Sequence, residues 1–123
     1  MKLSVSMTER EDVVIVTVAG EVDVYTAPQL RSVLEERAAA DQTRIVVDLQ
    51  GVGFLDSTGL GVLVGRLKAV RKLGGTLHVV CTDERILRLF AITGLDQVLP
   101  VHATVDEALA SVDDDVQEPD LSD

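Results

Sequence analysis

The chain predicts a single α/β domain with a mixed, mostly parallel five-stranded sheet and about four helices. Two observations support this prediction. Apolar runs of strand length alternate with stretches whose apolar residues recur at helical spacing, in the order ββαβαβαβα. Hydrophobic residues make up 46% of the 123 residues, enough for a core without metals or disulfides, and the aromatic fraction of 2% makes that core aliphatic.

The first two segments predict a hairpin. Residues 3–7 alternate between apolar and polar side chains, which is typical of a strand with one solvated face. Residues 13–19 are almost all apolar and predict a more buried strand, and the polar residues 8–12 between them indicate a turn. We therefore expect one antiparallel edge of the sheet, followed by a loop over residues 20–25.

The first helix has two candidate starting points. Thr26 and Gln29 have the spacing of a capping box. Pro28 disfavours helical geometry at Ala27, so Ala27 is the alternative cap, with Pro28 as the first helical residue. The apolar residues expected to face the sheet are Leu30, Val33 and Leu34.

The centre of the sequence joins a strand to a helix. Residues 44–49 are β-branched and apolar, as in a strand buried on both faces. Apolar residues then recur at helical spacing over residues 60–70, until Gly74 and Gly75 end the pattern. The segment 55–61 lies between the two elements and contains adjacent hydroxyl residues, Ser57 and Thr58.

The last third predicts a strand over residues 76–81 and a helix over residues 84–93, capped by Thr82 or Asp83 and ended by Gly94. Residues 98–101 suit an edge strand. A capping box then opens a final helix that ends at Val112. Parallel pairing and right-handed crossovers follow from this order, but the order leaves open whether the helices cover one face of the sheet or both.

The predicted domain spans residues 1–112, and residues 113–123 form an acidic tail that we expect to be disordered. The tail contains six of the acidic residues and no Lys or Arg. The formal net charge of −10 argues against a nucleic-acid partner. No apolar run approaches the ~20 residues of a membrane helix and no signal peptide is evident, so we expect a cytoplasmic protein with no membrane partner. The single Cys81 lies in an apolar run and predicts a buried thiol.

Enzyme motifs are incomplete. A hydrolase nucleophile elbow requires G-x-S-x-G, and Leu55 stands at the first glycine position before Ser57. The glycine pairs in residues 51–61 lack the lysine of a phosphate-binding loop and the third glycine of a dinucleotide fingerprint. His78 and His102 fit structural roles, and no Cys and His residues have metal-ligand spacing. The sequence therefore predicts no enzyme, no cofactor, no catalytic residue and no metal site.

Two features suggest a binding role instead. Ser57 and Thr58 lie where a helix is expected to begin, and free backbone N–H groups at a helix start favour anions; the alternative is that Asp56 or Ser57 only caps the helix. One side of that helix is small and uncharged, which permits close approach of a partner backbone or of a segment of the same chain. Its residues are Thr58, Gly61, Val62, Gly65 and Ala69.

Residues 20–23, 54–63, 88–90 and 93–95 (G-E-V-D, F-L-D-S-T-G-L-G-V-L, R-L-F and T-G-L) resemble the STAS-domain anti-sigma factor antagonists. The resemblance runs from about residue 3 to residue 112. It implies a mixed sheet whose helices lie mostly on one side. It also implies binding to a serine-kinase anti-sigma factor, release of the sigma factor, phosphorylation of Ser57 that ends binding, and a serine phosphatase that restores it.

By the same resemblance, Asp23 corresponds to an acidic residue at the kinase interface, and Ser57 rather than Thr58 is the phosphate acceptor. The position of Thr58 at the helix start keeps it as the alternative acceptor. The expected partner-binding residues are Asp23, Asp56, Ser57, Thr58, Gly59, Gly61, Val62 and Gly65. Two other functions remain open: a STAS subunit of a larger signalling or lipid-transport assembly, and a small hydrolase that uses Ser57.

Overall fold

A computed structural model describes residues 3–116 of the chain and confirms the predicted order of strands and helices. One additional short 3-10 helix, η1, lies between α3 and β5. The elements are β1 (Leu3–Arg10), β2 (Val13–Val22), α1 (Ala27–Ala39), β3 (Arg44–Leu55), α2 (Ser57–Lys72), β4 (Thr76–Val80), α3 (Glu84–Thr93), η1 (Leu95–Gln97), β5 (Val101–His102) and α4 (Val105–Val116).

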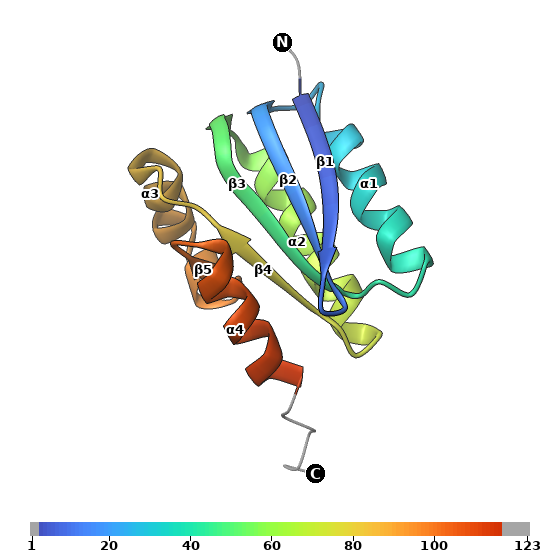
Figure 1. Ribbon diagram of the computed structural model, residues 1–123. Coiled ribbons are helices and arrows are strands. Elements are labelled where there is room, and N and C mark those ends of the chain that lie inside the picture. Colours follow the sequence, from blue (N-terminus) through green and yellow to red (C-terminus); the bar gives the residue numbers. More distant parts are fainter. Residues whose placement is uncertain (1–2, 117–123) are drawn as a thin grey trace.

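The strands form one sheet in the order β1-β2-β3-β4-β5 (Figure 1). β1 pairs antiparallel with β2, as the hairpin prediction required, and every other pairing is parallel. Because parallel strands end on the same side of a sheet, the loops that follow β2 and β3 are neighbours. This neighbourhood positions the candidate site.

The helices lie on both faces of the sheet, but unequally. The larger core cluster packs α1, α2 and α3 against one face through residues such as Leu30, Leu63 and Phe90. A smaller cluster packs α4 against the other face, where Ala108 and Val112 contact strand residues (Figure 1). Three helices on one side and one on the other answer the question that the element order left open, and they agree with the layering that the resemblance implied.

The predicted boundaries of α3 are confirmed at both ends. Asp83, rather than Thr82, is the N-cap, and its carboxylate accepts a hydrogen bond from the backbone N–H of Arg85 at 2.8 Å. Gly94 ends the helix in the left-handed conformation at φ 75°. Both termini were predictable because each depends on a single residue type with a local role.

Other predicted boundaries are wrong. β1 continues to Arg10 into the turn predicted over residues 8–12, and β4 ends at Val80, one residue before the predicted end. β2 continues to Val22 into the predicted loop, and β3 continues six residues beyond Leu49 to Leu55. The edge strand is limited to Val101–His102, whereas Leu99 is fully buried outside any strand. The extended ends of β2 and β3 pair with each other through register shifts, which a run containing glycines does not reveal.

At the start of α1 the N-cap is Thr26, but the predicted capping box does not form. The Thr26 hydroxyl donates instead to the carbonyl oxygen of Glu21 at 2.7 Å. At the other end of the chain, α4 extends to Val116, four residues beyond the predicted domain end. Residues 117–123 of the predicted tail lie outside the described residues, so their disorder stays a prediction.

Candidate functional site

The candidate site lies at the carboxyl ends of β2 and β3. Val22 pairs with Leu55 at the end of the two strands, and the backbone N–H of Asp56 donates to the carbonyl oxygen of Val22 at 3.3 Å. The next residue after each strand end is acidic, Asp23 after β2 and Asp56 after β3. The strand pairing thus brings together two carboxylates that are 33 positions apart in the sequence.

Asp56 caps α2. Its Oδ1 atom accepts hydrogen bonds from the backbone N–H groups of Thr58 at 2.9 Å and Gly59 at 3.3 Å. These are two of the N–H groups that a helix start leaves without an intrahelical partner. Asp56 therefore caps the helix, as the alternative interpretation expected, and it occupies part of the N-terminus that we considered as an anion site.

Ser57 is the first residue of α2 and is exposed to solvent. Since Asp56 is the cap, the Ser57 side chain has no role in capping. Within residues 3–116 its hydroxyl makes no hydrogen bond. An exposed serine hydroxyl on an ordered helix terminus is accessible to a modifying enzyme, whereas Asp56 is partly buried and engaged in the cap.

Asp23 organises the loop between β2 and α1. Its Oδ1 atom accepts hydrogen bonds from the backbone N–H groups of Tyr25 at 2.9 Å and Thr26 at 3.0 Å. The bond from Thr26 is the main reason why the pKa of Asp23 lies below its ordinary value, with the bond from Tyr25 acting in the same direction. The carboxylate therefore stays ionised, and it adds negative charge beside the start of α2.

The apolar residues of this loop were missed by the sequence interpretation. Tyr25 is 88% exposed and Val24 is 58% exposed, next to the partly buried Asp23. On β3, Phe54 is 48% exposed just before Leu55 and Asp56. Large exposed apolar side chains close to a site are typical of a binding surface. The only sequence signal for this exposed apolar surface is a Tyr within a predicted loop.

The three glycines predicted to contact a partner separate into two groups. A Cβ atom on Gly59 would lie 2.7 Å from Cγ1 of Val22, so Gly59 permits close packing inside the protein and is buried. By contrast, a Cβ atom on Gly61 or Gly65 would have no neighbour within 4 Å. Packing within the chain thus explains Gly59, and it does not explain Gly61 or Gly65.

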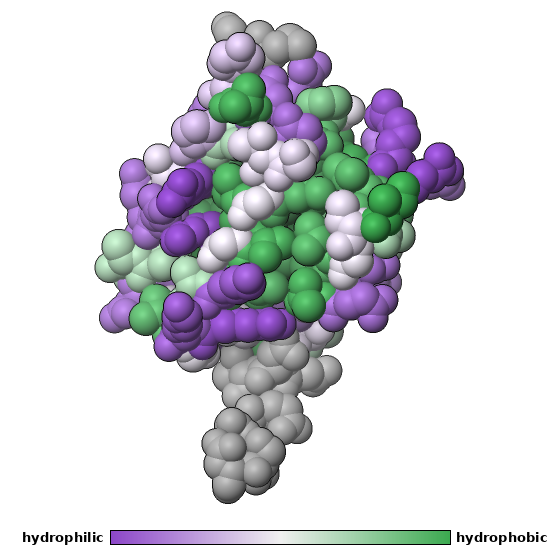
Figure 2. Space-filling view, turned by 180° about the vertical axis from the view of Figure 1, so that it is seen from behind, coloured by the Kyte–Doolittle hydropathy of each residue, from purple (hydrophilic) through white to green (hydrophobic). Residues whose placement is uncertain are grey.

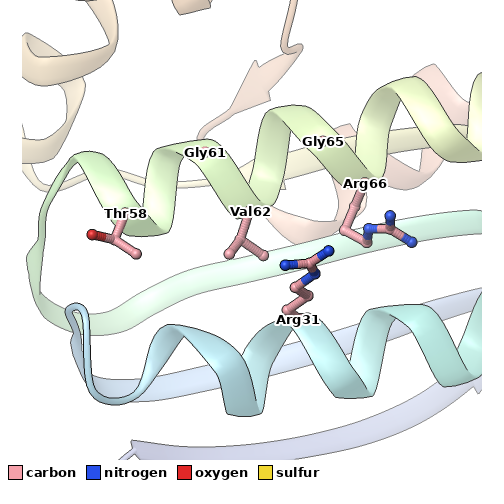
Figure 3. A pocket seen from close by; sticks show the side chains of 6 residues that line it. All are labelled: Arg31, Thr58, Gly61, Val62, Gly65 and Arg66. Atoms are coloured by element: carbon pink, nitrogen blue, oxygen red, sulfur yellow. The ribbon is translucent and has the colours of Figure 1, made fainter.

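The exposed side of α2 belongs to a helix-covered face on which apolar and small residues occupy the middle and charged residues the border (Figure 2). Between α1 and α2 lies a groove of about 320 Å³. The groove is lined by Arg31, Thr58, Gly61, Val62, Gly65 and Arg66 (Figure 3). The sequence pattern identified four of these residues, but it missed both arginines, because Arg31 comes from another helix and the pattern selected only small, uncharged residues.

The two histidines of the chain lie together, on β4 and β5. Nδ1 of His78 is 2.9 Å from Nε2 of His102, and the rings stack with their centroids 5.1 Å apart. Burial raises the pKa of the Cys81 thiol, as expected for a buried cysteine. Among the described residues, no cluster of three or more His, Cys, Asp or Glu side chains is suitable for a metal ion, and no helix is long and apolar enough to cross a membrane.

Comparison with known proteins agrees with the resemblance in the sequence. Residues 4–108 match the model of the STAS domain family. The anti-sigma-B factor antagonist of Bacillus subtilis (strain 168) is 42% identical over 103 residues, which are 84% of this chain and 94% of that protein. The protein of the same name from Staphylococcus aureus (strain NCTC 8325 / PS 47) is 40% identical over 102 residues, 83% of this chain and 94% of its own.

Among solved structures, an anti-sigma factor antagonist from Mycobacterium paratuberculosis superimposes with a TM-score of 0.85 at 32% sequence identity, covering 91% of this chain and 95% of that one. A match of this extent, on a mixed sheet with an Asp-Ser pair at the start of α2, defines a STAS domain. The chain belongs to the STAS-domain family of anti-sigma factor antagonists.

Proposed function

We propose that the unphosphorylated protein binds a serine-kinase anti-sigma factor and thereby frees the sigma factor, and that phosphorylation of Ser57 switches binding off. A serine phosphatase acting on phosphorylated Ser57 then restores binding. The observation that carries this proposal is the exposed Ser57 hydroxyl at the start of α2, beside a capping carboxylate and a small, open helix face. We further propose that the protein acts by binding rather than by catalysis, in the cytoplasm.

The proposed partner contacts are made by the acidic residues at the strand ends and by the exposed side of α2. Gly59 is omitted because it is buried against Val22 and Leu55. The exposed Tyr25 is added because it lies in the same loop as Asp23. The proposed contact residues are Asp23, Tyr25, Asp56, Ser57, Thr58, Gly61, Val62 and Gly65.

The switch follows from charge. A phosphate adds about −1.5 to −2 charges at neutral pH. On Ser57 it would lie next to Asp56, whose Oδ1 atom already holds the N–H groups of Thr58 and Gly59. Because those two groups are engaged and Ser57 is exposed, the phosphate projects towards solvent or a docked partner. A difference of about 1–3 kcal/mol between the two forms changes affinity about 5–150-fold, enough to exchange partners.

Thr58 stays the alternative acceptor, because it is exposed as well. Two observations support Ser57. Thr58 lines the groove between α1 and α2, whereas Ser57 lies outside it at the end of the helix, which gives a kinase active site better access. The family resemblance also aligns Ser57 with the phosphorylated position.

The test is phosphorylation by the anti-sigma factor kinase of the same organism. The wild-type protein, Ser57→Ala and Thr58→Ala are incubated with the kinase and ATP, and modified sites are mapped by mass spectrometry. We expect loss of phosphate in Ser57→Ala and normal labelling of Thr58→Ala. Unchanged labelling of Ser57→Ala would exclude Ser57 as the acceptor.

Binding provides the second half of the test. The affinity for the same kinase is measured for the wild type, Ser57→Ala and Ser57→Glu. We expect Ser57→Ala to bind like the wild type and Ser57→Glu to bind at least about fivefold more weakly, the lower end of common coupling energies. Equal affinities for Ser57→Ala and Ser57→Glu would contradict a mechanism based on negative charge.

The other two functions gain no specific support. A hydrolase needs a base close to the serine, and in the described residues the Ser57 hydroxyl has no hydrogen-bonded partner, while the two histidines contact each other. The two curated relatives compared above carry the name anti-sigma-B factor antagonist, and neither name refers to a transport assembly.

A further inference from the structure

The groove between α1 and α2 carries positive charge in a strongly acidic protein. Arg31 extends from α1 and Arg66 from α2, and both side chains lie at the same end of the groove (Figure 3). Thr58 lies at the other end, next to the start of α2 (Figure 3). The formal net charge of the chain is −10, whereas α2 itself contains four basic residues and no acidic one.

The two arginines share a single carboxylate. Oε2 of Glu35 is 3.0 Å from Nε of Arg31 and 3.9 Å from Nη2 of Arg66. Two positive charges against one negative charge leave this end of the groove with a net positive charge. Each guanidinium carries five N–H donors, and these two contacts use only a small part of that capacity. The cluster can therefore bind a further carboxylate without losing Glu35.

Breaking the present contacts costs the fold little. The Arg31–Glu35 pair joins residues four apart on the surface of α1, with side chains 61% and 43% exposed. Exposed pairs of this kind contribute little to stability. The Arg66 side chain is only 20% exposed, so helix packing rather than Glu35 holds its stem in the groove. The arginines are thus positioned by the fold and available for a new anion.

The face of α2 consequently has two ends of opposite charge. Asp23 and Asp56 lie at the start of the helix, and Arg66 lies ten residues beyond Asp56 along α2, which corresponds to about 15 Å, with Arg31 of α1 at the same end of the groove. The surface between them is open and small, because Gly61 and Gly65 have no neighbour where a Cβ would be. A partner that approaches this surface closely has to match both ends.

We propose that an acidic segment of the anti-sigma factor kinase docks in the α1–α2 groove against Arg31 and Arg66. This inference rests on the proposed function and extends it. The acidic end at Asp23 and Asp56 selects a basic region of the same partner, and the arginine end fixes the direction in which the partner lies along α2. Paired, planar guanidinium groups suit carboxylates, since each can donate two parallel hydrogen bonds.

The test compares charge reversals at the two groove arginines with a charge reversal outside the groove. Arg66→Glu, Arg31→Glu and the double variant are compared with Lys68→Glu, which makes the same charge change at an exposed position of α2 outside the groove. Affinity for the kinase that phosphorylates the chain is measured by calorimetry at two salt concentrations. Arg66→Gln serves as a milder variant, and circular dichroism with thermal unfolding establishes that each variant is folded.

We expect the double variant to bind at least tenfold more weakly, Arg66→Gln to lie between it and the wild type, and Lys68→Glu to stay within about twofold of the wild type. The salt dependence of binding decreases in the double variant, because fewer charged contacts remain to be screened. If the wild type binds and the folded double variant binds equally well, the groove proposal is overturned and the proposed function stands. If the unphosphorylated wild type does not bind the kinase, the proposed function fails, and this inference fails with it.

Discussion

Gly59 on α2 is in direct contact with Val22 at the end of β2. A Cβ atom on Gly59 would lie 2.7 Å from Cγ1 of Val22, and closer still to Cδ1 of Leu55. Glycine at this position allows the start of α2 to lie directly on the ends of the two strands that carry Asp23 and Asp56. The relative position of the two carboxylates and Ser57 therefore depends on residue 59 having no side chain.

We expect Gly59→Ala to destabilise the protein although alanine is the better helix former. Overpacking a tight site costs about 1–3 kcal/mol, and helix propensity returns about 1 kcal/mol of this. Val22 is β-branched and cannot move its methyl groups easily. Urea unfolding of Gly59→Ala gives the measurement, with Gly61→Ala as the control, since an added Cβ there meets no atom within 4 Å. Greater stability of Gly59→Ala than of the wild type would contradict the packing argument.

At Gly65 we expect a small substitution to raise stability and a large one to weaken binding. Gly65→Ala is expected to stabilise α2 by up to about 1 kcal/mol, because the site is open and alanine favours the helix. The larger Gly65→Leu is expected to weaken kinase binding, because it fills the groove lined by Val62 and Arg66. Thermal unfolding and affinity are measured on the same preparations. Full affinity of a stable Gly65→Leu protein would show that no partner approaches this part of α2.

These glycines also illustrate what the sequence could predict. The D-S-T-G-L-G run located the site, and the small face of α2 was evident from helical periodicity. The pattern did not distinguish the buried Gly59 from the open Gly61 and Gly65, because the distinction depends on Val22, a residue 37 positions earlier. The local spacing of residues in the sequence carries no information about long-range packing of this kind.

The fold shows the same division between local and long-range causes. α3 was predicted within its observed bounds because Asp83 and Gly94 end it by local chemistry. β3 was predicted six residues too short, because its last part is stabilised by pairing with β2 and contains Gly51 and Gly53. Arg31 was not associated with the site, since only the packing of α1 against α2 brings it to the groove.

Tyr25 is expected to be an important contact for the partner. Its side chain is 88% exposed in the loop that also holds Asp23, so the fold gains little from it. Tyrosine is enriched among residues that dominate binding energies. We expect Tyr25→Ala to weaken kinase binding by about 1 kcal/mol or more, roughly fivefold, with unchanged thermal stability.

The matched control for Tyr25→Ala is Leu73→Ala. Leu73 is also an exposed apolar residue, 62% exposed, but it lies at the far end of α2 from Ser57. Affinities of both variants for the kinase are measured under the same conditions. Equal losses in the two variants would point to a general effect of surface hydrophobicity and would remove Tyr25 from the proposed interface.

The capping carboxylate of α3 predicts a pH dependence of stability. Hydrogen bonds from the Arg85 side chain, at 2.8 Å to Oδ2 and 3.2 Å to Oδ1, are the main cause that lowers the pKa of Asp83 from 3.8 to about 2. Because the pKa is lower in the folded protein, ionised Asp83 stabilises the fold above pH 3.8, and this contribution disappears as the pH falls through about 2.

Asp83→Asn keeps a good cap residue and removes only the charge. We therefore expect Asp83→Asn to be less stable than the wild type near neutral pH and the difference to vanish towards pH 2, measured by urea unfolding of both proteins across that range. Protonation of the other carboxylates affects both proteins alike, so a difference that stays constant down to pH 2 would mean that the Asp83–Arg85 contact does not stabilise α3.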